Sequence, residues 1–386
     1  MKSLTKYDVA VIGAGVFGTW IAYELNRAGK RVLLMDAYGA ANNRASSGGE
    51  SRVIRCSYGQ EEIYTRWAWA SLAKWKAFFN RVGGLPLFHQ TGVLWMARED
   101  DRLSTASFET LNRVGVPCEK LSHDELAKRF PQINFSDIPW AIWEPESGAL
   151  MARRAVQSLL FECLKTGVEY VQDAVVCPVN QKDFSKIETR NREVIQAQIF
   201  IFACGSWLPK LFPEVIGERI QPTKQEVYFF GVSAGDKRFA PPAMPVWGDF
   251  GDEVYGIPDL ENRGFKIAID RHGELFDPDF GLRETTAENL AKVRAYLAKR
   301  FPALHDAPVL ERRVCQYENT SKGDFLIDRH PQFANVWLVG GGSGHGFKHG
   351  PALGEYVAKR VIDEAKDIDP RFTLATKENV HQRAVY

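Results

Sequence analysis

The stretch YDVAVIGAGVFGTWIAYELNRAGKRVLLMD, Tyr7–Asp36, decides the fold of this chain. Its first apolar run, Tyr7–Ile12, predicts a buried β-strand, and the glycine pattern G-A-G-V-F-G follows at once. An amphipathic helical segment then leads to a second apolar run, Arg31–Met35, which ends at Asp36. Strand, glycine turn, helix, strand and acid make up the βαβ unit that binds dinucleotides, so the sequence predicts a nucleotide site near its start.

The three glycines and the acid each serve this site in a different way. Gly13 permits the tight turn, Gly15 lets the backbone approach a pyrophosphate, and Gly18 lets the helix pack closely on the strand. The positive end of the helix then faces the phosphates, and Asp36 can accept hydrogen bonds from a ribose. We therefore expect an α/β fold with a Rossmann-type domain. Neighbouring residues of the unit are predicted to line the same site: Ala14, Val16, Phe17 and Ala37.

The composition of the chain excludes several classes of protein. A length of 386 residues suits two domains, and 45% apolar with 25% charged residues is typical of a globular protein. The formal net charge of +1, with mixed signs along the chain, argues against a nucleic-acid or membrane partner. The six cysteines are scattered without metal-ligand spacing, which predicts reduced thiols, no metal site and a cytoplasmic location.

A second glycine-rich loop lies near the end of the sequence. The apolar run Asn335–Val339 precedes GGGSGHGFK, Gly340–Lys348, and a helix is expected from about Pro351 to Glu364. Backbone amides and a helix N-terminus are there available to a ligand for a second time. One dinucleotide held from both ends of the chain suits FAD, a long ligand, better than NAD.

The sequence between these two units changes character. From Gln221 to about Asp306 it contains short strand patterns at Tyr228–Val232, Val254–Ile257 and Gly264–Ile269, which predict antiparallel strands. Helices are predicted at Glu61–Val82, Met151–Thr166 and Thr286–Arg300. We expect a discontinuous FAD-binding domain with an inserted, β-rich antiparallel substrate domain. The FAD-binding domain takes residues 1–84, 149–220 and 319–375, the substrate domain residues 85–148 and 221–318, and a C-terminal tail residues 376–386.

Six motifs, in order along nearly the whole chain, are similar to those of one enzyme family. They are Tyr7–Asp36, SRVIRCSYG at Ser51–Gly59, TGVL at Thr91–Leu94, EPESG at Glu144–Gly148, CQY and FLIDRHP within Cys315–Pro331, and GSGHGFK at Gly342–Lys348. On these motifs the chain resembles the monomeric sarcosine oxidase and N-methyltryptophan oxidase group of FAD-dependent amine oxidases, which belongs to the D-amino-acid-oxidase-like superfamily.

The resemblance implies an FAD-dependent oxidase of a secondary or N-substituted amino acid. In this family a hydride passes from the carbon next to nitrogen to the flavin, the product is an imine, and oxygen is reduced to hydrogen peroxide. The implied partners are a small amine or amino-acid substrate and molecular oxygen, and the implied state is a monomer. Two alternatives stay open: a dehydrogenase with another electron acceptor, and a flavin-dependent RNA-modifying oxidoreductase, which the neutral charge disfavours.

The resemblance also implies roles for individual residues. The family attaches its flavin through a thioether to a cysteine that matches Cys315, although this residue type alone fits a buried core thiol. Arg55 and Lys348 match the pair that binds the substrate carboxylate; Arg55 by itself also suits an ion pair between domains. Lys266 matches the lysine that promotes the reaction with oxygen, whereas without the family it is an ordinary solvated strand residue.

Three departures from the family pattern concern the pocket. Tyr255 stands in Val-Tyr-Gly where the family carries Tyr-Tyr-Gly, Asp270 replaces an active-site histidine with His272 close by, and Ser47–Gly48 replaces a pair of histidines. We therefore expect the flavin chemistry to be kept and the substrate pocket to be rebuilt, which makes sarcosine a doubtful substrate.

Asp270 has two open interpretations. It can hold an additional basic or hydroxyl group of a substrate, or it can pair with Lys266 or Arg271. The predicted catalytic residues are Arg55, Tyr255, Lys266, Asp270 and Lys348. Besides Cys315 and the residues of the opening unit, the predicted cofactor contacts are Arg44, Ser47, Ser51, Arg52, Val175, Gly205, Trp207, Gly342, Gly344, His345, Gly346, Phe347 and Lys348.

Overall fold

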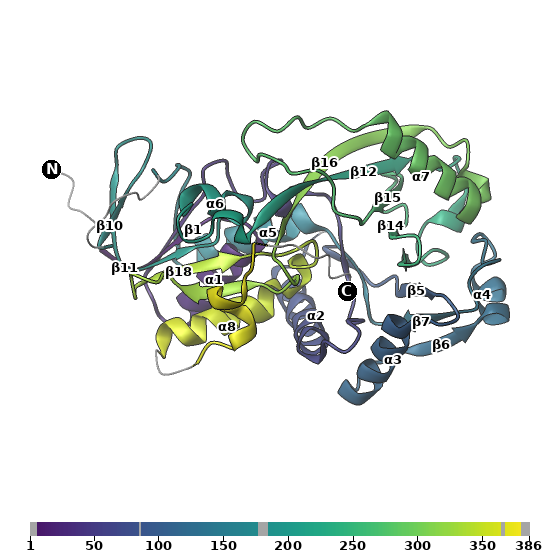
Figure 1. Cartoon of the computed structure of the whole chain (residues 1–386), viewed down its shortest axis with the longest axis horizontal. Helices are drawn as coiled ribbons and strands as arrows, with labels where there is room; N and C mark the ends of the chain where they lie inside the picture. The colour runs from purple at the N-terminus through teal and green to yellow at the C-terminus, as the bar shows by residue number, and fades with distance from the viewer. Residues whose placement is uncertain (1–5, 85, 177–183, 364–366, 380–386) are drawn as a thin grey trace.

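The first strand of the chain lies inside a seven-stranded sheet, as its apolar sequence requires (Figure 1). The computed structural model describes residues 6–84, 86–176, 184–363 and 367–379. Strand β1 (Lys6–Ile12) pairs in parallel with β2 (Val32–Met35) on one side and with β11 (Val194–Phe202) on the other. Helix α1 (Val16–Arg27) connects β1 to β2. The predicted βαβ unit is therefore confirmed.

The remaining strands extend this first sheet on both sides. Its order is β17, β18, β11, β1, β2, β9, and β10 pairs with the beginning of β11. The added strands are β9 (Glu169–Val171), β10 (Lys186–Glu188), β17 (Leu326–Arg329) and β18 (Val336–Gly340). Strands β10 and β17 are antiparallel to their neighbours and the others are parallel. The loops that follow the parallel strands therefore meet at one edge, where a ligand is expected.

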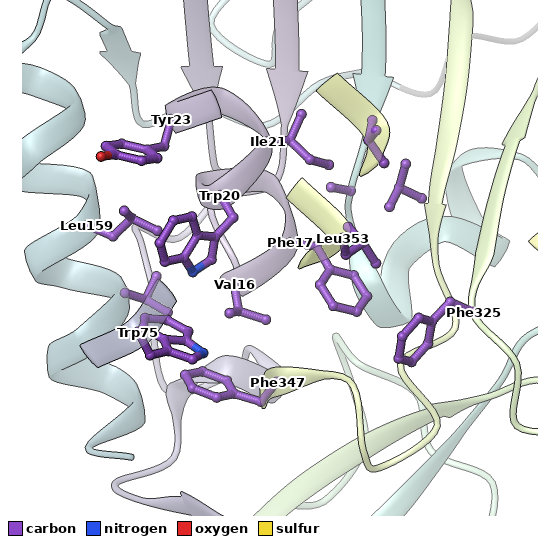
Figure 2. Packing of buried hydrophobic residues seen from close by; sticks show 14 of the residues in the cluster. Val16, Phe17, Trp20, Ile21, Tyr23, Trp75, Leu159, Phe325, Phe347 and Leu353 are labelled. Carbon is purple, nitrogen blue, oxygen red and sulfur yellow. The ribbon is translucent and has the colours of Figure 1, made fainter. Parts of the chain in front are cut away.

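Helices cover this sheet and pack on one another through aromatic side chains. They are α1, α2 (Glu62–Val82), α5 (Ala152–Lys165), the short α6 (Leu208–Leu211) and α8 (Gly350–Ile362). Trp20 on α1 lies 5.1 Å from the ring of Trp75 on α2, which in turn stacks on Phe347 at 5.9 Å (Figure 2). Helix α8 packs closely on α1, because a Cβ at Gly354 would lie 2.8 Å from Trp20. The core thus holds the end of the second glycine loop.

A second sheet of eight strands forms the other part of the molecule (Figure 1). Its order is β16 (Val309–Asn319), β12 (Gln221–Phe230), β15 (Phe265–Ile269), β14 (Val254–Ile257), β13 (Val246–Asp249), β5 (Val93–Ala97), β7 (Trp140–Glu144) and β6 (Glu119–Ser122). All neighbours are antiparallel except β13 and β5. The predicted antiparallel strands β12, β14 and β15 are confirmed, and the parallel pair of β13 and β5 joins two separate segments of the chain.

Helices α3 (Arg102–Val114), α4 (His123–Arg129) and α7 (Ala287–Arg300) accompany this second sheet. Helix α7 starts after Thr286, whose side chain accepts the N–H of Asn289, close to the predicted boundary. A third sheet of β3 (Arg52–Ile54), β8 (Gly148–Leu150) and β4 (Phe88–His89) forms where segments assigned to the two predicted domains meet. The domain boundaries themselves stay a prediction.

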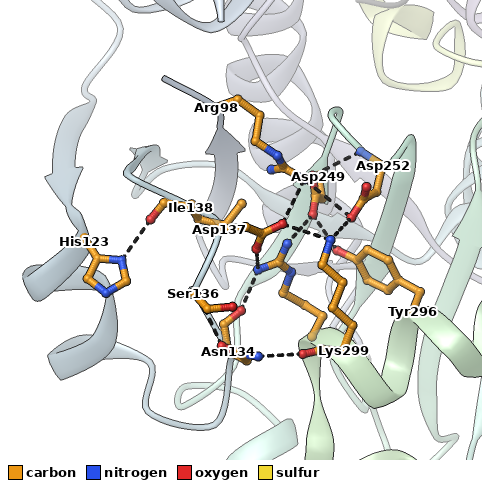
Figure 3. A network of polar contacts seen from close by, with 11 residues as sticks. Arg98, His123, Asn134, Ser136, Asp137, Ile138, Asp249, Asp252, Tyr296 and Lys299 are labelled. Carbon is orange, nitrogen blue, oxygen red and sulfur yellow. Dashed lines mark hydrogen bonds and ion pairs between the residues drawn. The ribbon is translucent and has the colours of Figure 1, made fainter. Parts of the chain in front are cut away.

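A buried ion pair fastens α7 to the second sheet (Figure 3). The guanidinium of Arg300, at the end of α7, donates to Asp249 at 2.8 Å, and both side chains are fully buried. Arg98 donates to the other oxygen of Asp249 at 2.9 Å, and the Tyr296 hydroxyl donates at 3.0 Å to the oxygen that Arg300 contacts. With the backbone N–H of Asp252 at 3.3 Å, four donors satisfy one buried carboxylate, which offsets the cost of removing these charges from water.

The described residues contain neither a membrane-spanning helix nor a cluster of metal ligands. No helix among them combines the length and the apolar character needed to cross a membrane. No cluster of three or more His, Cys, Asp or Glu side chains among them could hold a metal ion. Most of the predicted C-terminal tail, residues 380–386, lies outside the described residues, as does Cys177.

Candidate cofactor and substrate site

A cavity of about 340 Å³ lies at the edge of the first sheet that the fold predicts. Its wall combines the turn after β1, the loop before β3, the turn after β11, strand β16 and the second glycine loop. Most of the predicted cofactor residues line it: Gly13, Gly15, Val16, Phe17, Asp36, Ala37, Ser47, Arg52, Val175, Gly205, Trp207, Cys315, Gly342, Gly344, Gly346 and Phe347. Both ends of the chain therefore contribute to one elongated site.

Four predicted cofactor residues do not line this cavity but contact residues near it. The backbone N–H of Ala14 donates to Asp36 at 2.8 Å, and Gly18 leaves space for the Gly13 carbonyl, which a Cβ would meet at 1.8 Å. Arg44 donates to the carbonyl of Asp279 at 3.0 Å, and the carbonyl of Ser51 accepts a hydrogen bond from Lys266 at 2.8 Å. These residues support the wall rather than form it.

The turn after β1 has the shape and the polar groups that a dinucleotide needs. Gly13 has a φ of +104° and faces the chain of Ala203, whose oxygen a Cβ would meet at 2.4 Å. A Cβ at Gly15 would instead come no closer than 3.4 Å to another group, so the open space beside it is the cavity. The N-terminus of α1 and the carboxylate of Asp36 border the same space. Positive amide groups and an acid at this spacing fit a pyrophosphate and a ribose.

Strand β16 carries Cys315 and Glu318 along the opposite wall. The sulfur of Cys315 is half-buried and accepts a hydrogen bond from the Arg52 guanidinium at 3.1 Å. The carboxylate of Glu318 accepts one from the Ser46 hydroxyl at 2.7 Å, and burial raises the pKa of Glu318. Sequence reasoning missed Glu318, although it lies three residues after the cysteine on the same strand.

A smaller cavity of about 90 Å³ adjoins the large one. The two cavities share Arg52, Tyr317, Gly344 and Phe347 in their walls. Four of the five predicted catalytic residues line the small cavity: Arg55, Tyr255, Asp270 and Lys348. The predicted cofactor residue His345 lies here too.

Lys266, the fifth predicted catalytic residue, is buried beside this junction. Its ammonium donates to the Ser51 carbonyl at 2.8 Å and lies 6.0 Å from the centre of the Tyr255 ring. Burial, followed by the positive charge of Arg52, holds the pKa of Lys266 well below its usual range. The side chain is 2% exposed, so the alternative of a solvated strand residue is wrong.

Arg55 and Lys348 meet at the ring of Tyr58. The Arg55 guanidinium lies over Tyr58 and Trp95, with its carbon 4.4 Å and 4.6 Å from the two ring centres. Lys348 donates to the Tyr58 hydroxyl at 2.8 Å and to the carbonyl of His345 at 2.9 Å. Burial, followed by the charge of Arg55, lowers the pKa of Lys348 far below its usual value. Two cations held this close favour an anionic ligand.

The segment that carries Arg55 is fixed by a buried carboxylate. Glu144, at the end of β7, accepts the backbone N–H of Cys56 at 2.7 Å and that of Ser57 at 3.0 Å. It also accepts the Ser147 hydroxyl at 2.7 Å. The Glu144 carboxylate thus joins the EPESG segment to the RCS segment, a contact that the sequence alone did not reveal.

An acidic group faces the small cavity from β15. Asp270 follows this strand directly and accepts a hydrogen bond from the Tyr317 hydroxyl at 2.9 Å. Burial and the negative charge of Asp270 raise the pKa of Tyr317. Arg271, one of the predicted partners of Asp270, donates to Glu253 at 2.5 Å. Tyr317 was missed as a site residue, although its CQY motif was recognised.

Comparisons with known proteins agree with this arrangement. Residues 8–360 match the family model described as FAD dependent oxidoreductase. The chain is 29% identical to monomeric sarcosine oxidase of Bacillus sp. (strain B-0618), with 93% of both chains covered. It is 27% identical to N-methyl-L-tryptophan oxidase of Salmonella newport, with 94% of this chain and 97% of the relative covered.

Solved structures share the fold. The L-proline dehydrogenase of P. horikoshii is 22% identical and superposes with a TM-score of 0.82 over 96% of both chains. NikD, titled an unusual amino acid oxidase, is 18% identical with a TM-score of 0.77, over 95% of this chain and 97% of that one. The α/β fold with a Rossmann-type unit is thereby confirmed. With a family match over most of its length, this chain belongs to the FAD dependent oxidoreductase family.

Proposed function

We propose that this protein is an FAD-dependent oxidase of a secondary or N-substituted amino acid. The observation that carries the proposal is the small cavity with two buried cations, Arg55 and Lys348, which adjoins the elongated cavity through Arg52 and Tyr317. Bound FAD would supply the redox chemistry, namely oxidation of the bond between carbon and nitrogen to an imine with reduction of oxygen to hydrogen peroxide.

The side chains of this protein bind and orient the substrate. Arg55 and Lys348 bind the carboxylate, because a planar guanidinium and an ammonium together neutralise it in a site that excludes water. Trp95 and Phe250 form an apolar wall of the small cavity, and their rings stack 3.8 Å apart. With the carboxylate fixed at one end, the reacting carbon is directed toward the shared wall of the two cavities.

Two further residues act on the cofactor side in this proposal. Cys315, whose sulfur borders the large cavity, is the residue at which a thioether would hold the FAD. Lys266, a buried cation beside the same junction, promotes the reaction with oxygen by stabilising negative charge that develops there. The name of the relative called monomeric sarcosine oxidase supports a monomer, and we place the protein in the cytoplasm.

A screen with the purified holoenzyme tests this function. Peroxide release and oxygen uptake are measured with N-methyl, cyclic, glycated and primary amino acids. We expect equal amounts of peroxide formed and oxygen consumed with at least one secondary or N-substituted amino acid. Reduction of an artificial dye without oxygen uptake would identify a dehydrogenase instead. In Lys266→Met, anaerobic flavin reduction should persist while reoxidation by oxygen slows; unchanged reoxidation would remove Lys266 from the proposal.

A further inference from the structure

The small cavity carries charges of both signs at different places on its wall. Arg55 and Lys348 supply the positive side, and Asp270 supplies a carboxylate. The negative charge of Asp270 acts on Lys348 across the cavity: it raises the pKa of Lys348, whereas burial lowers that pKa. An amino acid is a ligand with the matching pattern, since its carboxylate and its amino group are bonded to the same carbon.

Asp270 also lies where the chemistry must occur. Its oxygen accepts the Tyr317 hydroxyl at 2.9 Å, and Tyr317 borders both cavities. Tyr317 is two residues from Cys315 on β16, so it stands beside the predicted attachment point of the flavin. A group bound by Asp270 therefore lies next to the shared wall, where the bond between carbon and nitrogen has to meet the cofactor.

The surroundings of Asp270 bear on both interpretations of this residue. Arg271 donates to Glu253 at 2.5 Å and Lys266 donates to the Ser51 carbonyl at 2.8 Å, so neither cation depends on Asp270 for an acceptor. A second basic group far out on a substrate would need room beyond a cavity of about 90 Å³. The amino group next to the reacting carbon needs no additional room.

We propose that Asp270 is the residue that binds the amino group of the substrate and selects amino acids over other carboxylic acids. This proposal rests on the proposed function and deepens it. The Asp270 carboxylate accepts an N–H of the substrate from one side and the Tyr317 hydroxyl from the other. Tyr317 is a positioning residue that keeps the carboxylate turned toward the ligand.

The test compares ligands that differ only in the nitrogen. L-proline and N-methylglycine each carry the amine, and tetrahydrofuran-2-carboxylate and methoxyacetate carry an ether oxygen in its place. Binding to the holoenzyme is followed by the change in flavin absorbance, without oxygen for the amines. In Asp270→Asn, which keeps an acceptor for Tyr317 but loses the charge, we expect dissociation constants about tenfold or more higher for the amines. Those of the ether acids should be unchanged or lower.

Two control variants separate the roles. Tyr317→Phe removes the positioning hydroxyl and should weaken the binding of amines less than Asp270→Asn does. Arg55→Ala should weaken the binding of the amines and of the ether acids by similar factors. The assignment of Asp270 is overturned if Asp270→Asn changes the dissociation constants of both ligand classes by the same factor, or changes neither. It is also overturned if Tyr317→Phe has the full effect of Asp270→Asn; in each case the carboxylate site stands.

If no ether acid binds, or if Arg55→Ala leaves the binding of the ether acids unchanged, the proposed function falls as well.

Discussion

The ammonium of Lys348 lies 2.8 Å from the hydroxyl of Tyr58, and both side chains are buried. The same hydroxyl lies 2.7 Å from Nε2 of His349. Burial and nearby positive charge hold the pKa of His349 well below its usual range, so the ring is a neutral partner. Tyr58 therefore connects the cation of the substrate cavity to the protein interior, and it fixes where that cation can point.

Replacing Tyr58 by Phe tests this link. The ring that underlies Arg55 is kept, while Lys348 loses the Tyr58 hydroxyl as an acceptor and keeps the carbonyl of His345. We expect carboxylate binding to weaken by about 1–2 kcal/mol, a factor of roughly 5–30 in the dissociation constant of methoxyacetate. Flavin content should stay at the wild-type level. Unchanged affinity would show that the hydroxyl does not position the ammonium.

Carboxylate binding should depend on pH through Lys348. Its pKa is lowered by burial and by Arg55, whereas a bound carboxylate favours the ammonium and raises that pKa. Binding therefore takes up a proton, and affinity is highest below the pKa of Lys348 in the free protein and falls as the pH rises through it. Titrations of methoxyacetate against flavin absorbance at several pH values check this. The dependence should disappear in Lys348→Met; affinity that rises with pH would contradict the assignment.

Glu144→Gln should weaken both the fold and the site. The substitution removes the charge that accepts two backbone N–H groups and the Ser147 hydroxyl, so we expect a loss of about 3 kcal/mol in the free energy of unfolding. The dissociation constant of methoxyacetate should rise too, because the segment that bears Arg55 loosens. Glu146→Gln is the matched control from the same motif. Its half-exposed carboxylate forms an ion pair with Lys76 at 2.7 Å, and little change is expected because such pairs contribute little to stability.

Cys315→Ser separates attachment of the cofactor from its binding. A serine oxygen cannot form the thioether, whereas the glycine turns and Asp36 that surround the cavity are untouched. After acid precipitation, we expect the wild-type protein to keep its yellow colour in the pellet and the variant to release it to the supernatant. Release from both proteins would show that Cys315 is not the point of attachment.

The parts of this molecule that the sequence predicts are those encoded locally. The βαβ unit, helix α2 and helix α7 follow from runs of neighbouring residues, and the structure places them within one residue of the predicted bounds at Glu62 and Ala287. Helix α3 was missed, and its buried residues are mostly small and polar, namely Ser104, Ser107 and Thr110 beside Leu111. Strand β16 was missed because its charged residues form a strand only through pairing with β12.

The contacts that complete the site are not local. Tyr58 and Lys348 are 290 residues apart, Glu144 lies 88 residues from Cys56, and Tyr317 reaches Asp270 across 47 residues. The sequence singled out Lys348 and Asp270 but not their partners Tyr58 and Tyr317, and it assigned no site role to Glu144 or Cys56. No single stretch of sequence shows which side chains will meet. The tertiary fold supplies that information.

The buried pair of Arg300 and Asp249 is expected both to stabilise the fold and to hold one wall of the small cavity in place. Gly248 and Phe250 flank Asp249 in the chain and line the small cavity, so displacement of Asp249 moves that wall. Asp249→Asn leaves the buried Arg300 without a full counter-charge on this side, and we expect a loss of about 3–5 kcal/mol in the free energy of unfolding. Thermal unfolding of the holoenzyme measures the loss of stability. Methoxyacetate binding, at a temperature where the variant is folded, measures the effect on the cavity wall. Asp306→Asn, which removes an exposed partner of His305, is the control and should leave both quantities unchanged. A variant that is destabilised but binds the acid with wild-type affinity would show that the pair holds the fold without shaping the cavity.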